Sequence, residues 1–354
     1  MADVVTVAGA ISPDELGITM CHVHLLNHLT VAEQKGDAAL VGASERLLRD
    51  SPVSMDLLGV VRRHHLEVCS TDNHLIGDID VAIAETMLFK RMGGASMVEA
   101  TPVGVGRDPV GLRKISGATG VNIICVAGWY INACHPAYIA ASSTAELAAM
   151  MVRELTVEIG STGVRAGVLK ATLSSAAPEI PFTGNEEKVL RAAARAQAET
   201  GAAMTMHPCH HYGRARHYHA YLDMIKAEGG NLERCFLSHM EFWAADFDYQ
   251  KSLLERGVYL AFDQFGGEEY VRPGWPKPSD QARVAAVVKL VQAGYGDRIM
   301  LSNEVVCKTR LRKYGGYGYA HVLENIVPDL RYWGVSEKQI NTMLVENPKK
   351  VLLF

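Results

Sequence analysis

Apolar residues along this chain gather into short runs that recur at fairly even intervals. Eight such runs occupy residues 18–23, 95–100, 121–127, 164–169, 202–206, 234–238, 257–262 and 298–302. Runs of this length, bounded by polar residues, are typical of buried β-strands. Longer segments with apolar residues at helical spacing separate them, most plainly residues 79–92, 145–159, 186–200, 217–228, 246–256, 280–293 and 319–334. The pattern therefore predicts strands that alternate with helices.

This alternation predicts the fold class. Strand–helix–strand units build parallel sheets, and eight units in one chain predict a closed (β/α)8 TIM barrel of the α/β class. The length of 354 residues suits a single domain of this kind, preceded by a short lead-in at residues 1–17. An open doubly wound sheet is the alternative fold, but no glycine-rich phosphate fingerprint follows the first run.

Two connections are longer than a minimal barrel needs. Residues 26–78 form an insertion after the first strand, and residues 263–279 after the seventh are rich in Gly, Pro and aromatic residues. Long loops in a compact domain are usually lids, binding loops or interface elements. We therefore expect both loops to serve the function of a single-domain protein.

Side chains that can bind metal ions stand at the ends of several runs. The first run ends in a His-x-His pair, His22 and His24, whose side chains share one face of an extended strand. Lys170, His207, His239 and Glu304 end or follow later runs. A His-x-His pair alone is more often structural, and a lysine after a strand is usually a surface ion-pair partner. Because functional groups of a barrel collect at the C-terminal ends of its strands, the whole set favours one metal site.

Composition excludes several classes of protein. The net charge is −4, from 39 acidic and 35 basic residues, and no basic stripe interrupts the chain. Because there is no basic stripe, we do not expect a nucleic-acid partner. Because no apolar run approaches the ~20 residues of a membrane span, we do not expect a membrane partner either. The seven cysteines mostly lie inside apolar runs and form no CxxC pair. With no signal-peptide pattern at the N-terminus, these features predict a cytoplasmic enzyme with a small-molecule substrate. We also expect a homodimer.

On these residues the chain resembles the phosphotriesterase-like family of the amidohydrolase superfamily over essentially its full length. The landmarks are His22-x-His24, Lys170, His207, His239, an acid after the eighth strand and the closing Glu346-Asn347-Pro348 segment. The stretches 101–108 and 308–321 resemble the lactonase-like or uncharacterised branches of that family.

The resemblance implies a centre of two divalent metal ions. By it, His22, His24 and Glu304 hold one ion, His207 and His239 hold the other, and Lys170, carboxylated by CO2, bridges them. A lysine amine is protonated near pH 7, with an ordinary pKa of ~10.4, whereas a carbamate is anionic and offers an oxygen to each ion. A bridging hydroxide is then the nucleophile. Zn²⁺ is the expected metal, with Mn²⁺ or Co²⁺ as alternatives.

The sequence also departs from the family pattern. The family has aspartate where this chain has Glu304, and related members read His-Met-Asp where this chain reads His239-Met240-Glu241. Members tuned for phosphotriesters carry an Asp–His proton shuttle, whose nearest positions here are Glu241 or Phe242 and Gln264. We therefore expect no such shuttle, and we assign the catalytic acid–base role to Glu304. Its extra methylene leaves open whether it binds metal directly or through water.

The loops after the strands supply candidate substrate-binding residues. These are Trp129, Tyr130, Phe265, Tyr270 and Trp275, which offer apolar surface, and Lys308, which could recognise a carboxylate or phosphate. Packing at the rim of the barrel is an equally good interpretation of the aromatic residues. For Lys308, exposure to solvent is the alternative interpretation. His210 and His211 either line the pocket or face solvent.

Together these features predict a metal-dependent hydrolase of a small carboxylic ester, most simply a lactone. Amide hydrolysis of a small N-acyl compound is the alternative reaction, and it would need Glu304 to protonate the leaving amine. A catalytically weak small-molecule-binding barrel is the alternative of another class. Phosphotriester hydrolysis is expected at most as a side activity.

Overall fold

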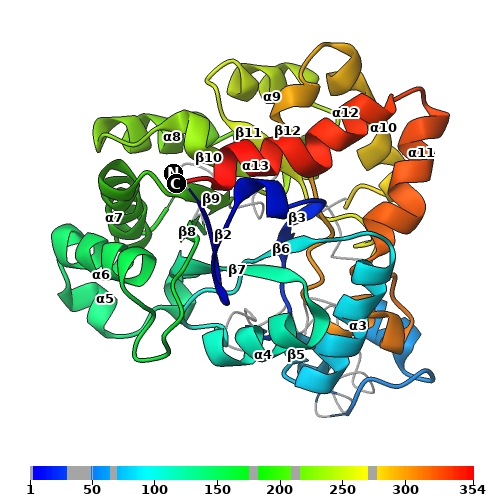
Figure 1. Cartoon of the computed structure of the whole chain (residues 1–354), viewed down its shortest axis with the longest axis horizontal. Helices are drawn as coiled ribbons and strands as arrows, with labels where there is room; N and C mark the ends of the chain where they lie inside the picture. Colours follow the sequence, from blue (N-terminus) through cyan, green and yellow to red (C-terminus); the bar gives the residue numbers. More distant parts are fainter. Residues whose placement is uncertain are drawn as a thin grey trace.

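The computed structural model describes residues 3–29, 49, 51–63, 70–174, 182–208, 216–269 and 277–354. Eight strands form one parallel sheet in which each strand lies beside its neighbour in the chain. In sheet order they are β3 (Thr19–Val23), β6 (Ser96–Glu99), β7 (Asn122–Gly128), β8 (Val168–Thr172), β9 (Ala203–His207), β10 (Cys235–Leu237), β11 (Tyr259–Phe262) and β12 (Ile299–Leu301). Figure 1 shows these strands at the centre of the molecule with helices around them. The predicted (β/α)8 barrel is confirmed.

Helices cover the outside of the barrel. The longer ones are α3 (Ile79–Arg91), α4 (Pro109–Thr119), α6 (Thr144–Thr156), α7 (Gly184–Thr200), α8 (Tyr218–Ala227), α9 (Phe247–Leu254) and α10 (Asp280–Gln292). The shorter ones are α2 (Leu58–Arg63), α5 (Tyr138–Ala141), α11 (Val327–Tyr332), α12 (Glu337–Asn341) and α13 (Asn347–Leu352). Each predicted helical segment contains a helix, although the last begins with a π-helical turn at Val322–Ile326 before α11.

The helix α4 was not predicted because its sequence contains two glycines and several β-branched residues, which have weak helix propensity. Its ends nevertheless carry ordinary capping signals. Asp108 accepts a hydrogen bond from the Gly111 N–H, Pro109 occupies the first turn, and Gly120 ends the helix in the left-handed conformation. Capping therefore marks a helix here that periodicity alone does not reveal.

The fourth strand starts later than predicted. The apolar run at 164–169 predicts a strand there, but β8 spans Val168–Thr172. Lys170 therefore lies within the strand and not after it. Gly128, at the end of β7, has a φ of 139°, and a Cβ at this position would collide with the Lys170 carbonyl oxygen. Only glycine lets the two strands approach this closely, so the sequence of β7 helps to fix the backbone at Lys170.

The barrel closes between β12 and β3 through a serine side chain. Ser302 Oγ donates to the His22 carbonyl oxygen at 2.6 Å and accepts from the His22 N–H at 3.1 Å. The Glu304 N–H donates to the same carbonyl oxygen at 3.1 Å. The first and last strands are thus joined at the residues predicted to bind metal.

The lead-in at residues 1–17 forms structure of its own. The strands β1 (Val4–Thr6) and β2 (Gly9–Ile11) make a hairpin, and the Val7 N–H donates to the Ile123 carbonyl oxygen at 2.8 Å. Apolar side chains from the hairpin, from α13 and from the barrel strands share one core cluster: Val4, Leu16, Cys21, Val98, Ile124, Val126, Val168, Ala203, Phe236, Tyr259, Ala261, Met300, Val351 and Leu352. The two termini lie together, as Figure 1 shows, because Asp3 and Phe354 exchange backbone hydrogen bonds. This end of the barrel is therefore sealed, and the opposite end carries the polar groups.

Both long loops are described in part. The ends of the insertion at 26–78 pair as the short strands β4 (Asn27–His28) and β5 (Leu75–Ile76), with α2 between them. After β11, residues 263–269 and 277–279 are described, whereas 270–276 lie outside the described residues.

No helix in the described parts of the chain is long and apolar enough to cross a membrane. The homodimer and the cytoplasmic location stay predictions.

We predict that Ser302→Ala weakens the closure of the barrel, because the buried His22 N–H would lose its acceptor. An unsatisfied buried donor costs about 1–3 kcal/mol, so the free energy of unfolding should fall by that amount in urea titrations. Ser116→Ala is the matched control, because Ser116 Oγ makes one buried hydrogen bond, to the Val121 carbonyl oxygen at 2.8 Å, away from the closure. Wild-type stability in Ser302→Ala would show that Ser302 does not hold the two strands together.

Candidate metal centre

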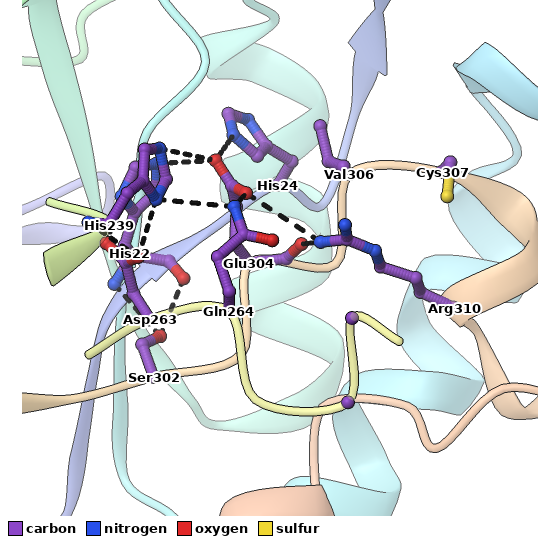
Figure 2. Close-up of polar contacts among 12 residues, drawn as sticks. His22, His24, His239, Asp263, Gln264, Ser302, Glu304, Val306, Cys307 and Arg310 are labelled. Atoms are coloured by element: carbon purple, nitrogen blue, oxygen red, sulfur yellow. Dashed lines mark hydrogen bonds and ion pairs between the residues drawn. The ribbon is translucent and has the colours of Figure 1, made fainter. Parts of the chain in front are cut away.

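The polar residues predicted from the strand ends meet at one mouth of the barrel. His22 lies in β3, Lys170 in β8 and His207 at the end of β9. His24 directly follows β3, and His239 and Glu304 lie in the turns just after β10 and β12. All six are buried. Figure 2 shows the imidazoles of His22 and His239 stacked together, with the Glu304 carboxylate between them and His24. The structure thus brings all six candidate ligands into one cluster.

Glu304 is at the centre of this cluster. Its Oε1 atom lies 3.1 Å from His239 Nε2, 3.5 Å from His22 Nε2 and 3.8 Å from His24 Nε2. Three groups of side chains among the described residues place their ligand atoms within 4.8 Å of one another: His22, His24 and Glu304; His207, His239 and Glu304; and His22, His239 and Asp263. The first two contain the ligand sets that the family resemblance implies, and the structure adds Glu304 to the pair His207 and His239, so that Glu304 is common to both groups.

Asp263 orients two of the histidines, and the sequence analysis did not identify it. Its Oδ2 atom lies 2.8 Å from His22 Nδ1 and its Oδ1 atom lies 2.6 Å from His239 Nδ1. Hydrogen bonds at Nδ1 leave the Nε2 atoms of both rings facing Glu304. Asp263 directly follows β11, so the rule that found the other candidates at strand ends could have found it too.

His24 is oriented by a second chain of hydrogen bonds. Thr101 Oγ1 donates to Glu99 Oε1 at 2.5 Å, so it accepts from His24 Nδ1, which lies 2.7 Å away. This fixes the neutral tautomer whose Nε2 lone pair faces Glu304. Burial raises the pKa of Glu99 to about 7. Glu99 is the last residue of β6, but in the sequence it stands inside the apolar run 95–100, so the strand-end rule did not single it out.

Backbone strain is concentrated at the same place. Among the described residues, His239 (φ 60°) and Glu304 (φ 29°) are the non-glycine residues with positive φ. A left-handed conformation is unfavourable for residues with a Cβ and persists where the surrounding contacts impose it. Both residues leave their strands by a sharp turn that directs their side chains toward the cluster.

The protonation of the histidines suits metal binding. Burial lowers the pKa of His22 and that of His24, the latter to about 3, so both rings are neutral near pH 7. Burial also disfavours a charge on His239, but Asp263 and Glu304 outweigh it and raise the pKa of His239 to about 10. The protonated ring of His239 thus places a positive charge between the Asp263 and Glu304 carboxylates. A bound metal cation could replace this proton and supply the positive charge.

Lys170 is a buried lysine in an unusual environment. Its Nζ atom lies 3.3 Å from His22 Nε2, and no carboxylate among the described residues forms an ion pair with it. Burial lowers the pKa of Lys170 to about 8, so a substantial fraction of the amine is neutral near that pH. Neutral imidazoles and an ionised carboxylate are ligands for divalent cations, so the donor set fits the metal centre.

The residues that replace the phosphotriesterase proton shuttle serve other roles. The Gln264 Nε2 atom donates to Glu304 Oε2 and lies 3.3 Å from His239 Nδ1. Glu241 is fully buried, and its Oε2 atom accepts weakly from the Asp263 N–H at 3.4 Å. Gln264 therefore forms a hydrogen bond with Glu304 directly, whereas Glu241 contacts the backbone of Asp263.

The predicted substrate-binding residues are scattered. Tyr130 lies beside the cluster, with its ring edge-on to His207 at 5.5 Å between centroids. Trp129 is buried and donates to the Tyr138 hydroxyl at 2.9 Å, while Phe265 packs in the apolar core. Lys308 forms an ion pair with Asp72 of the insertion at 2.5 Å. Tyr270, Trp275, His210 and His211 lie outside the described residues.

Comparisons with known proteins agree with this geometry. The sequence profile of the phosphotriesterase family matches residues 2–352. The N-acetyltaurine hydrolase of Bos taurus is 33% identical over 359 residues, covering 99% of this chain and 97% of that protein. A resiniferatoxin-binding protein from Rhodobacter sphaeroides superposes with a TM-score of 0.91 at 36% identity, covering 99% and 94%. A mutant PTE-like lactonase from Deinococcus radiodurans gives 0.74 at 26% identity, covering 99% of each chain.

The barrel and its buried histidine–carboxylate cluster define a metal-dependent hydrolase. The chain belongs to the phosphotriesterase family, whose members use binuclear metal centres. The predicted family, fold and enzyme class are therefore confirmed.

We predict that Asp263→Asn weakens metal binding. The asparagine side chain has no negative charge and a single acceptor oxygen, so it cannot accept from the Nδ1–H groups of both His22 and His239 as the carboxylate does. Loss of such an outer partner typically costs about 10–100-fold in metal affinity, which chelator competition measures. Asp280→Asn is the control, because Asp280 accepts from His321 at 2.6 Å outside the cluster. Equal metal affinity in the two variants would show that Asp263 does not support the ligands.

Proposed function

We propose that this protein hydrolyses the amide bond of a small N-acyl compound at a binuclear metal centre. The observation that carries the proposal is the position of Glu304, whose buried carboxylate contacts three imidazoles and stands one methylene further from its backbone than the family's aspartate. An amine leaving group is a strong base and needs a proton more than an alkoxide does. The N-acetyltaurine hydrolase relatives, which span nearly the whole chain, point to the same reaction.

The metal ions would be held by the two groups that share Glu304. We propose Zn²⁺, with Mn²⁺ or Co²⁺ as alternatives, and carboxylation of Lys170 to form the bridge between them. The burial of Lys170 without an ion-pair partner among the described residues supports this bridge, because a buried cation is costly and a carbamate would place an anion between two cations. When bound, the ions would supply Lewis acidity toward the substrate carbonyl and toward water.

The side chains of this chain would then move the protons. Glu304 accepts a proton from the attacking water and returns it to the leaving nitrogen, while Gln264 holds its Oε2 atom by a hydrogen bond. Burial, helped by the charge of Glu304, raises the pKa of Tyr130. The Tyr130 hydroxyl therefore stays protonated and can donate to an acyl oxygen beside His207.

Lactone hydrolysis, predicted first from the sequence, is the second candidate, because the same groups can open a cyclic ester. The Deinococcus lactonase supports it at 26% identity. The resiniferatoxin-binding protein from Rhodobacter, at 36% identity, supports the alternative of another class, a barrel that binds a small molecule with little turnover. These two alternatives and the amidase differ in what they do to one substrate panel.

The panel compares metal-loaded protein on N-acetyltaurine, N-acetyl amino acids, simple lactones and a phosphotriester. We expect kcat/KM for an N-acyl compound to exceed that for lactones by at least about tenfold, which corresponds to about 1.4 kcal/mol of preferential transition-state stabilisation. Chelation should abolish this activity, and added metal should restore it. A lactone as best substrate would contradict the amidase, and binding without turnover would favour the binding protein.

Replacement of Glu304 tests its assigned role. Glu304→Gln should lower kcat by about 10²–10⁴-fold with little change in KM, because general acid–base catalysis contributes about that factor. Glu186→Gln is the control, since Glu186 is a buried carboxylate that accepts the Asn132 N–H at 2.9 Å away from the cluster. Turnover within about threefold of the parent in Glu304→Gln would contradict the acid–base role.

A further inference from the structure

The strained backbone at Glu304 is held by an arginine. Arg310, in the 3-10 turn Lys308–Arg310, donates from Nη1 to the Glu304 carbonyl oxygen at 2.6 Å. The same nitrogen lies 3.7 Å from Glu304 Oε2. Figure 2 shows Arg310 reaching Glu304 from the side away from His22 and His239. One guanidinium therefore contacts both the backbone and the carboxylate of the residue at the centre of the cluster.

The other edge of the guanidinium is anchored. Arg310 donates from Nε to Glu269 Oε1 at 2.7 Å and from Nη2 to Glu269 Oε2 at 3.2 Å. Glu269 in turn accepts from Lys277 Nζ at 2.7 Å. The exposed fractions of the Arg310 and Glu269 side chains are both 4%, so this bidentate pair is shielded from water. The pair fixes the plane of the guanidinium relative to the segment after β11.

We propose that Arg310 is a positioning residue that sets the direction of the Glu304 carboxylate. A φ of 29° is unfavourable for glutamate, and a charged donor on its carbonyl oxygen stabilises the backbone in that conformation. A guanidinium presents its donors in a rigid plane, so it can bind Glu269 with one edge and Glu304 with the other. Lysine has no such plane and cannot make both contacts in one geometry.

The proposal rests on the proposed function of Glu304, and a double-mutant cycle separates the two. Arg310→Met and Arg310→Lys are each made in the wild type and in Glu304→Gln. If Arg310 acts through Glu304, each should lower kcat by about 10–100-fold in the wild type, the usual effect of losing an outer partner, and by less than about twofold in Glu304→Gln. KM should change little in both backgrounds.

Metal affinity gives a readout that does not depend on turnover. Because Glu304 belongs to both ligand groups, misdirecting it should weaken metal retention in chelator competition. The same non-additivity is expected: a loss on replacing Arg310 in the wild type and none beyond that of Glu304→Gln in the double variant. Arg310→Lys keeps the charge, so it tests the geometry should Arg310→Met fold poorly.

Arg107 provides the matched control. It also forms a bidentate pair, partly buried, with Glu154 at 2.6 and 2.7 Å, and it also donates to a backbone carbonyl oxygen, that of Val126 at 2.9 Å. Arg107→Met should lower the thermal unfolding midpoint as Arg310→Met does, yet keep kcat per folded molecule and metal affinity.

Three outcomes would overturn the positioning role of Arg310. They are an equal loss of kcat in both Glu304 backgrounds, a rise in KM with kcat unchanged, or the same kcat loss in Arg107→Met. Failure of the proposed function is distinguishable from these, because it would show as a Glu304→Gln enzyme that keeps its turnover.

Discussion

The contact of the Glu304 carboxylate with three buried imidazoles is the interaction on which the rest of the barrel mouth depends. A carboxylate removed from water loses several kcal/mol of hydration, which only nearby positive charge and hydrogen bonds can offset. Here His239 outweighs the burial penalty and holds the pKa of Glu304 well below its ordinary value. The cluster is therefore an anionic site that is complete only when a proton or a cation occupies it.

The barrel supports this charge with groups that also hold the strands together. Ser302 joins β12 to the His22 backbone, and Asp263 joins β11 to the rings of His22 and His239. Arg310 fixes the turn at Glu304 from the other side. Because each of these groups links two or more segments, a small displacement of one strand would move several ligand atoms. Rigid placement of this kind is what catalysis by positioned charges requires.

Most of the barrel could be predicted from the sequence because its strands appear as short apolar runs and its helices as longer segments with apolar residues at helical spacing. The six candidate ligands were found because functional groups gather at strand ends, and the structure brings them together. The apolar pattern predicts Lys170 after its strand, whereas Lys170 lies inside β8. The prediction is wrong because Val164 and Ala166 are apolar and buried, as strand residues are, although they precede the strand. Asp263 follows the same strand-end rule but resembles an ordinary loop aspartate.

Other features depend on tertiary contacts that no local pattern reveals. Phe265 and Trp129 are aromatic residues near strand ends, yet both pack in the core, and Trp129 also donates a hydrogen bond to the Tyr138 hydroxyl. Lys308 pairs with Asp72, more than two hundred positions away in the sequence. Arg310 is one of several cations in a basic stretch, and only the folded chain distinguishes it from its neighbours. The choice between ester and amide depends equally on such contacts.

The central claim is that one cluster, with Glu304 common to both of its ligand groups, is a binuclear metal centre. Elemental analysis of active, dialysed protein beside its specific activity tests this most directly. We expect about two divalent ions per chain, with activity that falls in parallel as a chelator removes them. Full activity at trace metal content would contradict it.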